Sequence, residues 1–345
     1  MRIYRSFIAI TVLTAILSFG SAYALEPIPE ESGFSGFLSI GAGYSYVKSN
    51  MISGNDFGNV GNRTVDSLTS SPDGNSSGGI QPGFDLRYTF GSTGTQLFVG
   101  TALEDVLRYD FATQLGVAQK LPGENLVAAS FLFSSVPTQV WRDPYVLFAK
   151  REKTDRDSKG FRVAWDRIFG TQLQIQYSYR KIELDDEFSG VFLGLNPIAQ
   201  GQLDREGKEH QVDILYRFIF GDGKHRIVPA IIYNNLDLDG GAMKNDGIDF
   251  QLTYGYNAEK YSFVVNGVIG YRDYDDTNPI YLKTRDDDIY GAGLIAFYHT
   301  PFGWSVPGFK KTSLYFKTDY IKSDANINFY DTELFGAGAG LFLRF

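Results

Sequence analysis

Oppositely charged residues recur in close pairs within otherwise apolar segments, and these pairs are the main candidates for chemistry. The members of a pair are two or four residues apart, so on a β-strand both side chains point to the same face. The pairs are Asp85 with Arg87, Arg108 with Asp110, Arg162 with Asp166, Asp213 with Arg217, and Lys317 with Asp319, and Arg180, Asp249 and Arg272 occupy equivalent positions.

Two interpretations of these charges, as side chains that line the lumen of a barrel, remain open. In a water-filled pore they would steer polar solutes across a constriction. Alternatively, they form an ion-pair network that fills and stiffens the interior, because isolated charges are costly in a low dielectric. Cations and anions nearly balance, which argues against strong ion selectivity. No run of one sign indicates a site for phosphate or sugar acids.

One segment has the spacing of a calcium-binding loop. Asn235, Asp237, Asp239 and Gly240 follow the pattern N-x-D-x-D-G, and Asp246 falls at the twelfth position. Oxygen ligands at alternate positions suit a hard cation. Calcium bound by Asn235, Asp237, Asp239 and Asp246 is therefore one interpretation. A solvated acidic hairpin loop without any cofactor is the favoured one, because the first and twelfth ligands differ from the usual Asp and Glu.

The residues that support enzymatic chemistry are few. Cysteine is absent, and His210, His225 and His299 are the only histidines. His210 begins a strand near one rim, but no serine or acidic partner accompanies it at motif spacing. We therefore expect no enzyme and assign no catalytic residue.

The elements that must position the charges are short alternating strands. Apolar residues at Leu173, Ile175, Tyr177 and Tyr179 oppose polar ones at Gln172, Gln174, Gln176, Ser178 and Arg180. Comparable alternation occurs near residues 34–46, 84–90, 212–218 and 248–256. Apolar-out, polar-in segments of ~9–11 residues are typical of strands that cross an outer membrane. The sequence thus predicts an all-β fold, a transmembrane antiparallel up-and-down β-barrel.

The C-terminal segment, residues 333–345, reads ELFGAGAGLFLRF. Its outward parity is apolar and its inward parity is mostly glycine, with Phe342 as the exception. An apolar edge strand suits a closed barrel, in which the last strand pairs with the first. We interpret Phe345 as a signal for the barrel-assembly machinery. The glycine row marks a place where the lumen is open or where another side chain packs closely.

Loop lengths predict the strand number. Long polar segments at 49–79, 185–207, 237–246 and 273–285, with smaller ones at 120–124, 153–160 and 323–331, are interpreted as seven outer loops. Seven outer loops imply about 14 strands, with 12 or 16 as alternatives. The segment 96–117 resists assignment as one strand or a hairpin, because residues 102–107 break the alternation.

The two ends of the sequence suggest export to the cell outer membrane. Arg2 and Arg5 precede an apolar run from Phe7 to Phe19 and the motif Ala22-Tyr23-Ala24, the pattern of a signal peptide. We expect residues 1–24 to be a signal peptide and 25–345 the barrel.

The net charge of −8 argues against nucleic-acid partners. The expected partners are outer-membrane lipid and lipopolysaccharide, and we expect Trp141 and Trp304 in an aromatic belt near the periplasmic turns.

Three segments resemble one known family. The stretch IPEESGFSGF from Ile28 to Phe37, the triplet Leu103-Glu104-Asp105 and the motif WRDPY from Trp141 to Tyr145 are similar to an uncharacterised, domain-of-unknown-function family of proteobacterial outer-membrane barrels. The resemblance implies the fold and the location, and it transfers no catalytic or binding residue.

From the residues, a porin-like channel for passive diffusion of small polar solutes is the leading functional hypothesis. A closed structural or adhesion barrel that acts through its outer loops is the alternative. An outer-membrane hydrolase is the least favoured.

Overall fold

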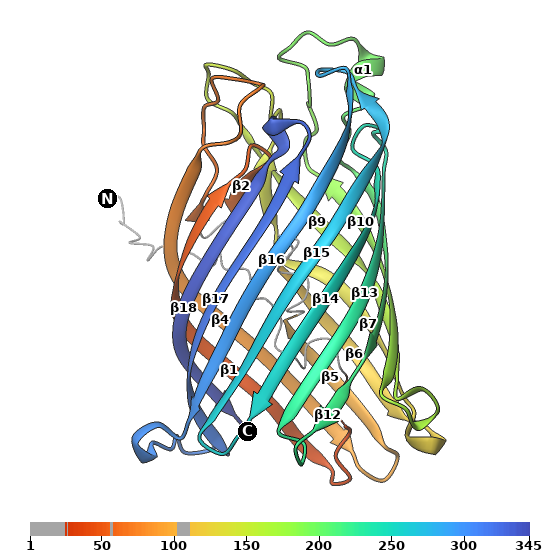
Figure 1. Cartoon of the computed structure of the whole chain (residues 1–345), viewed down its shortest axis with the longest axis vertical. Coiled ribbons are helices and arrows are strands. Elements are labelled where there is room, and N and C mark those ends of the chain that lie inside the picture. Colours follow the sequence, from red (N-terminus) through yellow and green to blue (C-terminus); the bar gives the residue numbers. More distant parts are fainter. Residues whose placement is uncertain (1–24, 26, 56–57, 102–110) are drawn as a thin grey trace, which may run out of the picture.

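The computed structural model describes residues 25, 27–55, 58–101 and 111–345, which form a tall, closed β-barrel (Figure 1). The expected signal peptide lies outside the described residues. Fourteen antiparallel strands form the wall within the described chain, which confirms the predicted fold and strand number. They are β1 (Gly33–Lys48), β4 (Gly74–Phe90), β5 (Thr95–Thr101), β6 (Phe111–Lys120), β7 (Leu126–Val136), β9 (Lys153–Asp166), β10 (Leu173–Leu184), β11 (Gly207–Tyr216), β13 (His225–Leu238), β14 (Asn245–Asn257), β15 (Tyr261–Asn278), β16 (Lys283–His299), β17 (Lys311–Ala325) and β18 (Thr332–Arg344).

Two of these strands continue after a one-residue break. β8 (Thr138–Trp141) continues β7 beyond Pro137, which has no backbone N–H to donate to a ladder. β12 (Phe218–Phe220) continues β11 beyond Arg217 and pairs with the start of β13. Both breaks leave the strand direction unchanged, so the wall remains continuous.

The wall closes where β1 pairs with β18, from Phe37 opposite Arg344 to Lys48 opposite Glu333. The sequence left open why the inner parity of β18 is glycine. A Cβ on Gly43 would overlap the side-chain amide of Gln81, and one on Gly338 would lie 2.6 Å from its Oε1. The missing side chains therefore make room for Gln81, which packs across the seam.

The two faces of the wall differ as the alternation predicts. On β9, Phe161, Val163 and Trp165 are exposed on the outside, whereas Arg162 and Asp166 are buried on the inside. The same division recurs around the barrel and produces an outer belt of exposed aliphatic and aromatic side chains. Such a belt is typical of a barrel whose outer surface faces lipid.

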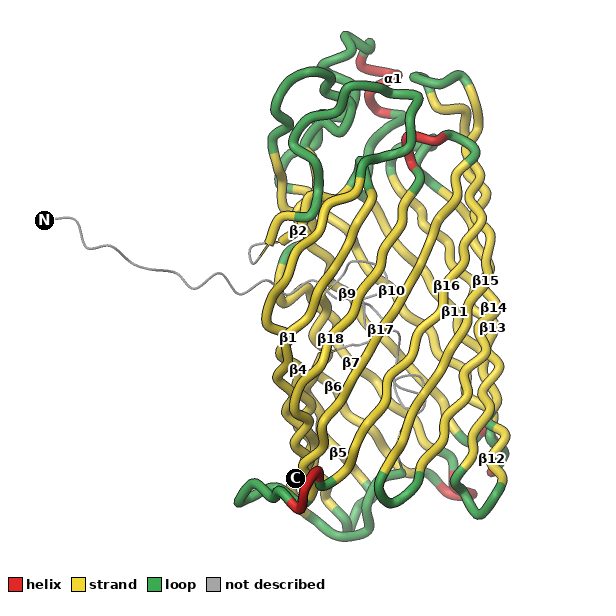
Figure 2. Tube along the Cα trace, turned by 60° about the vertical axis from the view of Figure 1, so that its left-hand side comes forward, coloured by secondary structure: helices red, strands yellow, loops and turns green. Residues whose placement is uncertain are grey.

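The connections define two ends, which we call the loop end and the turn end (Figure 2). The turn end carries the connections 91–94, 121–125, 167–172, 221–224, 258–260 and 300–310. Three of these contain a single 3-10 turn, η2 (Pro122–Glu124), η3 (Ile168–Gly170) and η4 (Pro301–Gly303). The loop end carries 49–73, 142–152, 185–206, 239–244, 279–282 and 326–331, and the connection 102–110 lies outside the described residues.

Two of the seven predicted outer loops are wrong. Residues 120–124 form a connection at the turn end, and residues 153–160 belong to β9. The first half of β9 is polar on both faces, yet it stays a strand because its backbone pairs with β8 and β10. The segment 96–117 is a hairpin, since β5 and β6 pair from Thr95 opposite Gln119 to Thr101 opposite Thr113. The connection between β5 and β6 and the loop 142–152 take the place of the two wrong loops, so the number of outer connections is still seven.

The loop end holds the remaining regular structure. The short strands β2 (Ile52–Asn55) and β3 (Gly58–Asn59) pair with each other, and β2 also pairs with β8. The loop 185–206 contains the one-turn helix α1 (Pro197–Gly201), and 326–331 contains η5 (Asn328–Tyr330). No helix in the described part of the chain is long and apolar enough to cross a bilayer.

Candidate functional site

The barrel interior is the candidate site, and it has three levels. We call them the cap, formed by the loops at the loop end, the middle network of polar side chains on the inner wall, and the vestibule, a cavity at the turn end. Each level draws its residues from strands and loops that are distant in sequence, so the fold is what brings them together.

The cap is a hydrophobic core built from the loops and the strand ends below them. Its buried members are Val65, Val140, Tyr145, Ile182, Leu184, Leu203, Leu238, Ala242, Met243, Ala325, Ile327, Phe329 and Tyr330. They come from five different connections or the strand ends beside them. Because apolar surface is removed from water in one contiguous cluster, the loops stabilise one another as a folded unit.

Tyrosine hydroxyls provide polar contacts inside this core. The hydroxyls of Tyr145 and Tyr330 lie 2.6 Å apart, and Asn278 donates from Nδ2 to Tyr330 at 2.7 Å. The rings of Tyr145 and Phe329 stack with centroids 5.3 Å apart. Burial raises the pKa of both Tyr145 and Tyr330, so both hydroxyls stay protonated and can share a hydrogen bond.

Asp143 ties two loops together. Its carboxylate accepts hydrogen bonds from the backbone N–H groups of Tyr145 at 3.0 Å, Gly190 at 3.1 Å and Phe192 at 2.9 Å. The first donor belongs to loop 142–152 and the other two to loop 185–206. A buried carboxylate that accepts several N–H groups is well compensated for its desolvation. The WRDPY motif that resembles the family is thus part of the cap.

Trp141 and Arg151 attach loop 49–73 to the cap. Trp141 is 0% exposed, and the guanidinium of Arg151 lies 4.3 Å from the centre of its ring. Arg151 also donates to the backbone carbonyls of Asn50 at 2.8 Å and Pro144 at 3.1 Å. The expected place of Trp141 in a belt near the turns is wrong. It lies at the opposite end, because β7 and β8 rise past the apolar belt before the loop begins.

The middle network contains most of the charges expected to line the lumen. Asp85 and Arg87 pair within β4 at 2.6 Å, as their spacing suggests. Asp166 instead pairs with Arg217, two strands away, because a long arginine reaches across strands that are ~4.8 Å apart. Arg108 and Asp110 lie outside the described residues. Arg180, Asp213, Asp249, Lys317 and Asp319 are all buried on the inner wall.

Further hydrogen bonds connect these residues around the wall. Arg162 donates from Nε to Ser178 at 2.8 Å, and Gln176 donates to Asp213 at 2.8 Å. Arg272 binds both carboxylate oxygens of Asp249 at 2.6 and 2.7 Å. Arg180 is 3.9 Å from Glu209. The network is therefore mostly cross-strand, whereas the sequence suggested pairs within single strands.

The proposed calcium ligands lie at the tip of the β13–β14 hairpin, where protein groups contact them. Asn235 and Tyr233 both donate to Asp246, at 3.0 and 2.5 Å. Asp237 pairs with Lys244 at 2.9 Å, and this hydrogen bond lowers the pKa of Asp237. Among the described residues no group of three or more acidic or histidine side chains is arranged to hold a metal. Calcium binding by Asn235, Asp237, Asp239 and Asp246 stays a prediction.

The histidines bind neighbouring hydroxyl groups. His210 shares a hydrogen bond with the hydroxyl of Tyr177, and His225 with that of Tyr254, each at 2.8 Å. His299 lies between Ser262 and Ser313, with both contacts at 2.9 Å. His210 sits on the outward parity of β11, among the rings of Tyr177 and Tyr179, and not in the lumen.

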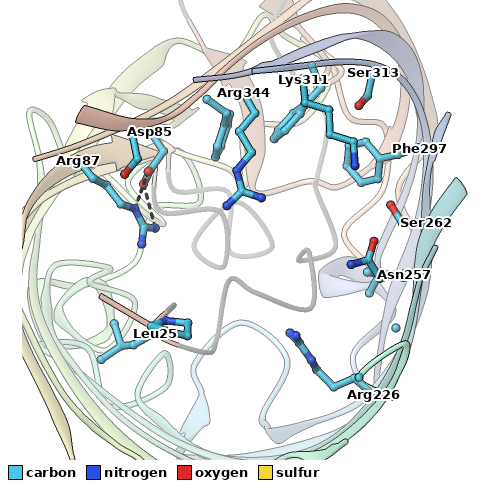
Figure 3. A pocket seen from close by; sticks show the side chains of 18 of the residues that line it. Leu25, Asp85, Arg87, Arg226, Asn257, Ser262, Phe297, Lys311, Ser313 and Arg344 are labelled. Atoms are coloured by element: carbon cyan, nitrogen blue, oxygen red, sulfur yellow. Dashed lines mark hydrogen bonds and ion pairs between the residues drawn. The ribbon is translucent and has the colours of Figure 1, made fainter. Parts of the chain in front are cut away.

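The vestibule is a cavity of about 900 Å³ at the turn end. Asp85 is the one carboxylate side chain among the lining residues that the structure describes, against the cations Arg87, Arg167, Arg217, Lys224, Arg226, Lys310, Lys311 and Arg344. Figure 3 shows Arg87, Arg226 and Arg344 extending toward the cavity from three sides. Cationic side chains thus predominate among the described residues of this level, whereas the sequence predicted a near balance for the lumen as a whole.

Aromatic side chains line the same cavity beside the cations. The rings of Phe37 and Phe342 stack with centroids 4.7 Å apart, and Phe297 meets Phe342 edge-on at 5.3 Å. Phe342 broke the alternation of the last strand. That exception was a sign in the sequence of this apolar surface inside the barrel, and Phe37, on the same parity as Ser35 and Ser39, was another.

The N-terminal segment of the described chain also enters the vestibule. Leu25, Pro27 and Pro29 line the cavity, and the backbone N–H of Leu25 donates to Gln174 at 3.4 Å. Ile28 is buried against Phe98 and Leu126. This contact could not be predicted from the sequence, because residues 25–32 show no alternation of apolar and polar side chains.

Comparisons with known proteins bear on the fold and the family. OmpT, an outer membrane protein of Vibrio cholerae, shares 12% identity over 90% of this chain and 98% of that chain, with a TM-score of 0.38. A Pseudomonas aeruginosa FadL homologue shares 11% identity over 97% and 94%, with a TM-score of 0.43. Pseudomonas aeruginosa OccK3 shares 13% identity over 92% and 97%, with a TM-score of 0.36. No curated protein matches the sequence.

The TM-scores below 0.5 carry no argument about function. The family comparison is more direct, because residues 33–343 match a single family model and these residues include every strand of the barrel wall. The chain therefore belongs to DUF2860, a family of proteins of unknown function.

Proposed function

We propose that the protein is an outer-membrane channel for the passive diffusion of small polar solutes, closed at the loop end by the cap. The exposed apolar belt supports a place in lipid, and the polar inner wall supports a path for solutes. In the usual orientation of such barrels, the loop end faces the exterior and the turn end the periplasm. Lipid and lipopolysaccharide would then surround the wall, and the strand ending at Phe345 would meet the barrel-assembly machinery.

The observation that carries this proposal is the continuity between the middle network and the vestibule. Asp85, Arg87 and Arg217 belong to both. A solute in the vestibule therefore meets charged and amide groups that can replace its lost water contacts one at a time. A barrel with a purely structural role has no need of a polar cavity open to one side.

The cap sets a condition for the passage of solutes. Its core spans loops from around the rim, so solutes pass only when the loops move apart. Single-channel recording in planar bilayers tests both parts of the proposal. We expect rare openings for the native protein and frequent, larger ones after residues 188–204 are replaced by a short Gly-Ser linker.

The control for this experiment is replacement of the turn 305–308, which lies at the other end. It should leave the opening frequency unchanged. Silence from both the native protein and the loop-deleted protein, each shown to be folded by its faster migration before heating, would refute the channel.

One observation favours the alternative, a closed barrel that acts through its outer loops. Loop 185–206 carries exposed apolar side chains at Phe188, Phe192 and Ile198 on a rigid base. If this alternative holds, deletion of 188–204 abolishes attachment of cells or partners, and conductance stays absent in both proteins. The same deletion therefore separates the two functions.

A further inference from the structure

We propose that the N-terminal segment of the described chain, residues 25 and 27–32, is a releasable strap that narrows the turn-end mouth of the barrel. The strap lies against the inner wall at the vestibule, and its release widens the path for solutes. This inference rests on the channel proposed above only for the claim that release raises conductance. Docking and release of the strap are measured without any current.

The strap follows the inner wall around half of the barrel. It joins β1 at Gly33, contacts the turn after β4, then β5, β6 and β7, and ends at β10. β10 is the seventh of the fourteen wall strands when they are counted from β1. At this far end the backbone N–H of Leu25 donates to Gln174 at 3.4 Å. The strap therefore extends along one whole side of the mouth.

The side chains of the strap point in two directions. Ile28 points to the wall and is 9% exposed. Pro27 and Pro29, on either side of it, line the cavity together with Leu25 (Figure 3). These three side chains occupy space that the mouth would otherwise leave open to solutes.

One isoleucine anchors the strap. Ile28 packs in a buried cluster with Phe98, Ala118, Leu126 and Ala128. Ala118 and Ala128 lie directly opposite each other in the ladder between β6 and β7, so two small side chains leave room for the larger one. Removal of this aliphatic side chain from water favours the docked strap.

The turn after β4 fits the strap closely. A Cβ on Gly91 would overlap the backbone carbonyl oxygen of Glu30. The backbone N–H of Gly91 also donates to Oγ of Ser32 at 2.9 Å. The φ of Gly91 lies outside the left-handed region, so the turn itself would accept an alanine. Glycine at this position therefore serves the close approach of the strap.

The strap is held more weakly than the strands of the wall. Pro27 and Pro29 have no backbone N–H and cannot join a hydrogen-bonded ladder. Within the described part of the chain, two hydrogen bonds connect the strap to the wall, at Leu25 and at Ser32. Residues 27 and 29–32 are exposed. A segment with so few buried contacts opens at a lower free energy than the core, so the strap detaches while the wall stays folded.

Disulfide cross-linking of the full chain tests docking, because the native protein contains no cysteine. Ile28→Cys with Ala118→Cys should cross-link under mild oxidation, since a disulfide requires Cα atoms about 4.4–6.8 Å apart. The control pair is Ile28→Cys with Ala112→Cys, a buried alanine on the same face of β6 ~20 Å away, and it should stay reduced. Mass spectrometry measures both. Equal cross-linking of the two pairs, or none in either, would overturn docking.

Maleimide labelling of the single variant Ile28→Cys tests release. The buried thiol reacts only while the strap is detached, so the labelling rate reports the detached fraction. Adding Gly91→Ala should raise this rate about tenfold, which corresponds to about 1.4 kcal/mol. Adding Gly255→Ala should not, because Gly255 also lines the vestibule but its Cβ would have its nearest neighbours at 3.9 Å. Equal rates with the two alanines would overturn the proposal.

Planar-bilayer recordings test the obstruction, with residues 188–204 replaced as above so that the cap does not limit the current. Ile28→Ser, which removes the anchor, should raise the unitary conductance about twofold. The cross-linked pair at positions 28 and 118 should keep the lower conductance until its disulfide is reduced. A conductance that is the same in all of these forms would overturn the obstruction.

Failure of the strap and failure of the channel are distinguishable. A barrel that conducts equally with the strap docked or detached keeps the channel and refutes the strap as an obstruction. A folded barrel that is silent in every form refutes the channel, while cross-linking and labelling still decide whether the strap docks and detaches.

Discussion

The two ends of the barrel interior share one wall and differ in almost everything else. At the loop end, long connections meet in an apolar core with buried tyrosines and a buried tryptophan. At the turn end, short connections leave a cavity lined by cations and aromatic rings. The two longest connections, 49–73 and 185–206, lie at the loop end, and both contribute to the cap. Length is not the whole difference, because the turn end also has one long connection, 300–310, and the short loops 239–244 and 326–331 supply buried residues of the cap.

The largest expected effect comes from the two tryptophans that mark these ends. Trp141 is 0% exposed in the cap, and Trp304 is 53% exposed at the turn end. Trp141→Ala should cost the cap ~3–5 kcal/mol, because a large buried side chain leaves a cavity. We expect limited proteolysis to cleave loops 49–73 and 142–152 rapidly while the wall remains folded. Trp304→Ala is the control, and equal proteolysis of both variants would contradict the contrast.

A second prediction concerns ion selectivity at the turn end. If the protein conducts as proposed, its reversal potential in asymmetric salt should indicate a preference for anions, because cationic side chains predominate among the described residues that line the vestibule. Lys311→Gln with Arg226→Gln should reduce this preference severalfold. Lys150→Gln at the loop end should not change it. A cation preference in the native protein would show that the vestibule does not set the selectivity.

A third, smaller effect tests the polar contacts of the cap. Tyr330→Phe removes the hydroxyl that contacts Tyr145 and accepts from Asn278, and should destabilise the cap by ~1–3 kcal/mol. Tyr281 is a matched control, because its buried hydroxyl has no hydrogen-bond partner among the described residues. Tyr281→Phe should be neutral or slightly stabilising. Hydrogen exchange of the loop amides measures both, and protection lost equally in both would contradict the assignment.

The smallest effect is a pH dependence at the tip of the β13–β14 hairpin. The hydrogen bond from Lys244 lowers the pKa of Asp237 below its ordinary value of 3.8. A carboxyl whose folded pKa is depressed contributes stability that is present above 3.8 and is lost as the pH falls through the lower folded value. In Lys244→Gln, NMR titration should show the pKa of Asp237 rising toward 3.8. An unchanged titration would assign the shift to another group.

The wall could be predicted from the sequence because lipid outside and polar groups inside impose a period of two on every strand. The alternation therefore predicts which side chains, such as Phe161 and Arg162, point outward and which point inward. The loop assignments were weaker, since polar residues 153–160 form a strand once β8 and β10 supply backbone partners. The predicted total of fourteen strands was nevertheless correct. The two segments wrongly predicted as outer loops, 120–124 and 153–160, equal in number the two outer connections that were missed, 102–110 and 142–152.

The cap and the vestibule could not be predicted from the sequence, for a different reason. Tyr145 and Tyr330 are 185 residues apart, and nothing local to either indicates that their hydroxyls meet. The vestibule cations sit beside separate turns, so their convergence follows only from closing the barrel. Ion pairs such as Asp166 with Arg217 likewise depend on strand register. Phe342, which broke the alternation, was a local signal of the aromatic surface inside the barrel, as was Phe37.

The carboxylate of Asp143 holds three backbone amides from two loops at once. Loss of any one of these hydrogen bonds weakens the other two, since a buried carboxylate with fewer donors is no longer compensated for its desolvation. The two loops therefore detach together. If the barrel conducts as proposed, we expect its conductance to change between two levels in abrupt steps, and the duration of each step to report the lifetime of the contacts of Asp143.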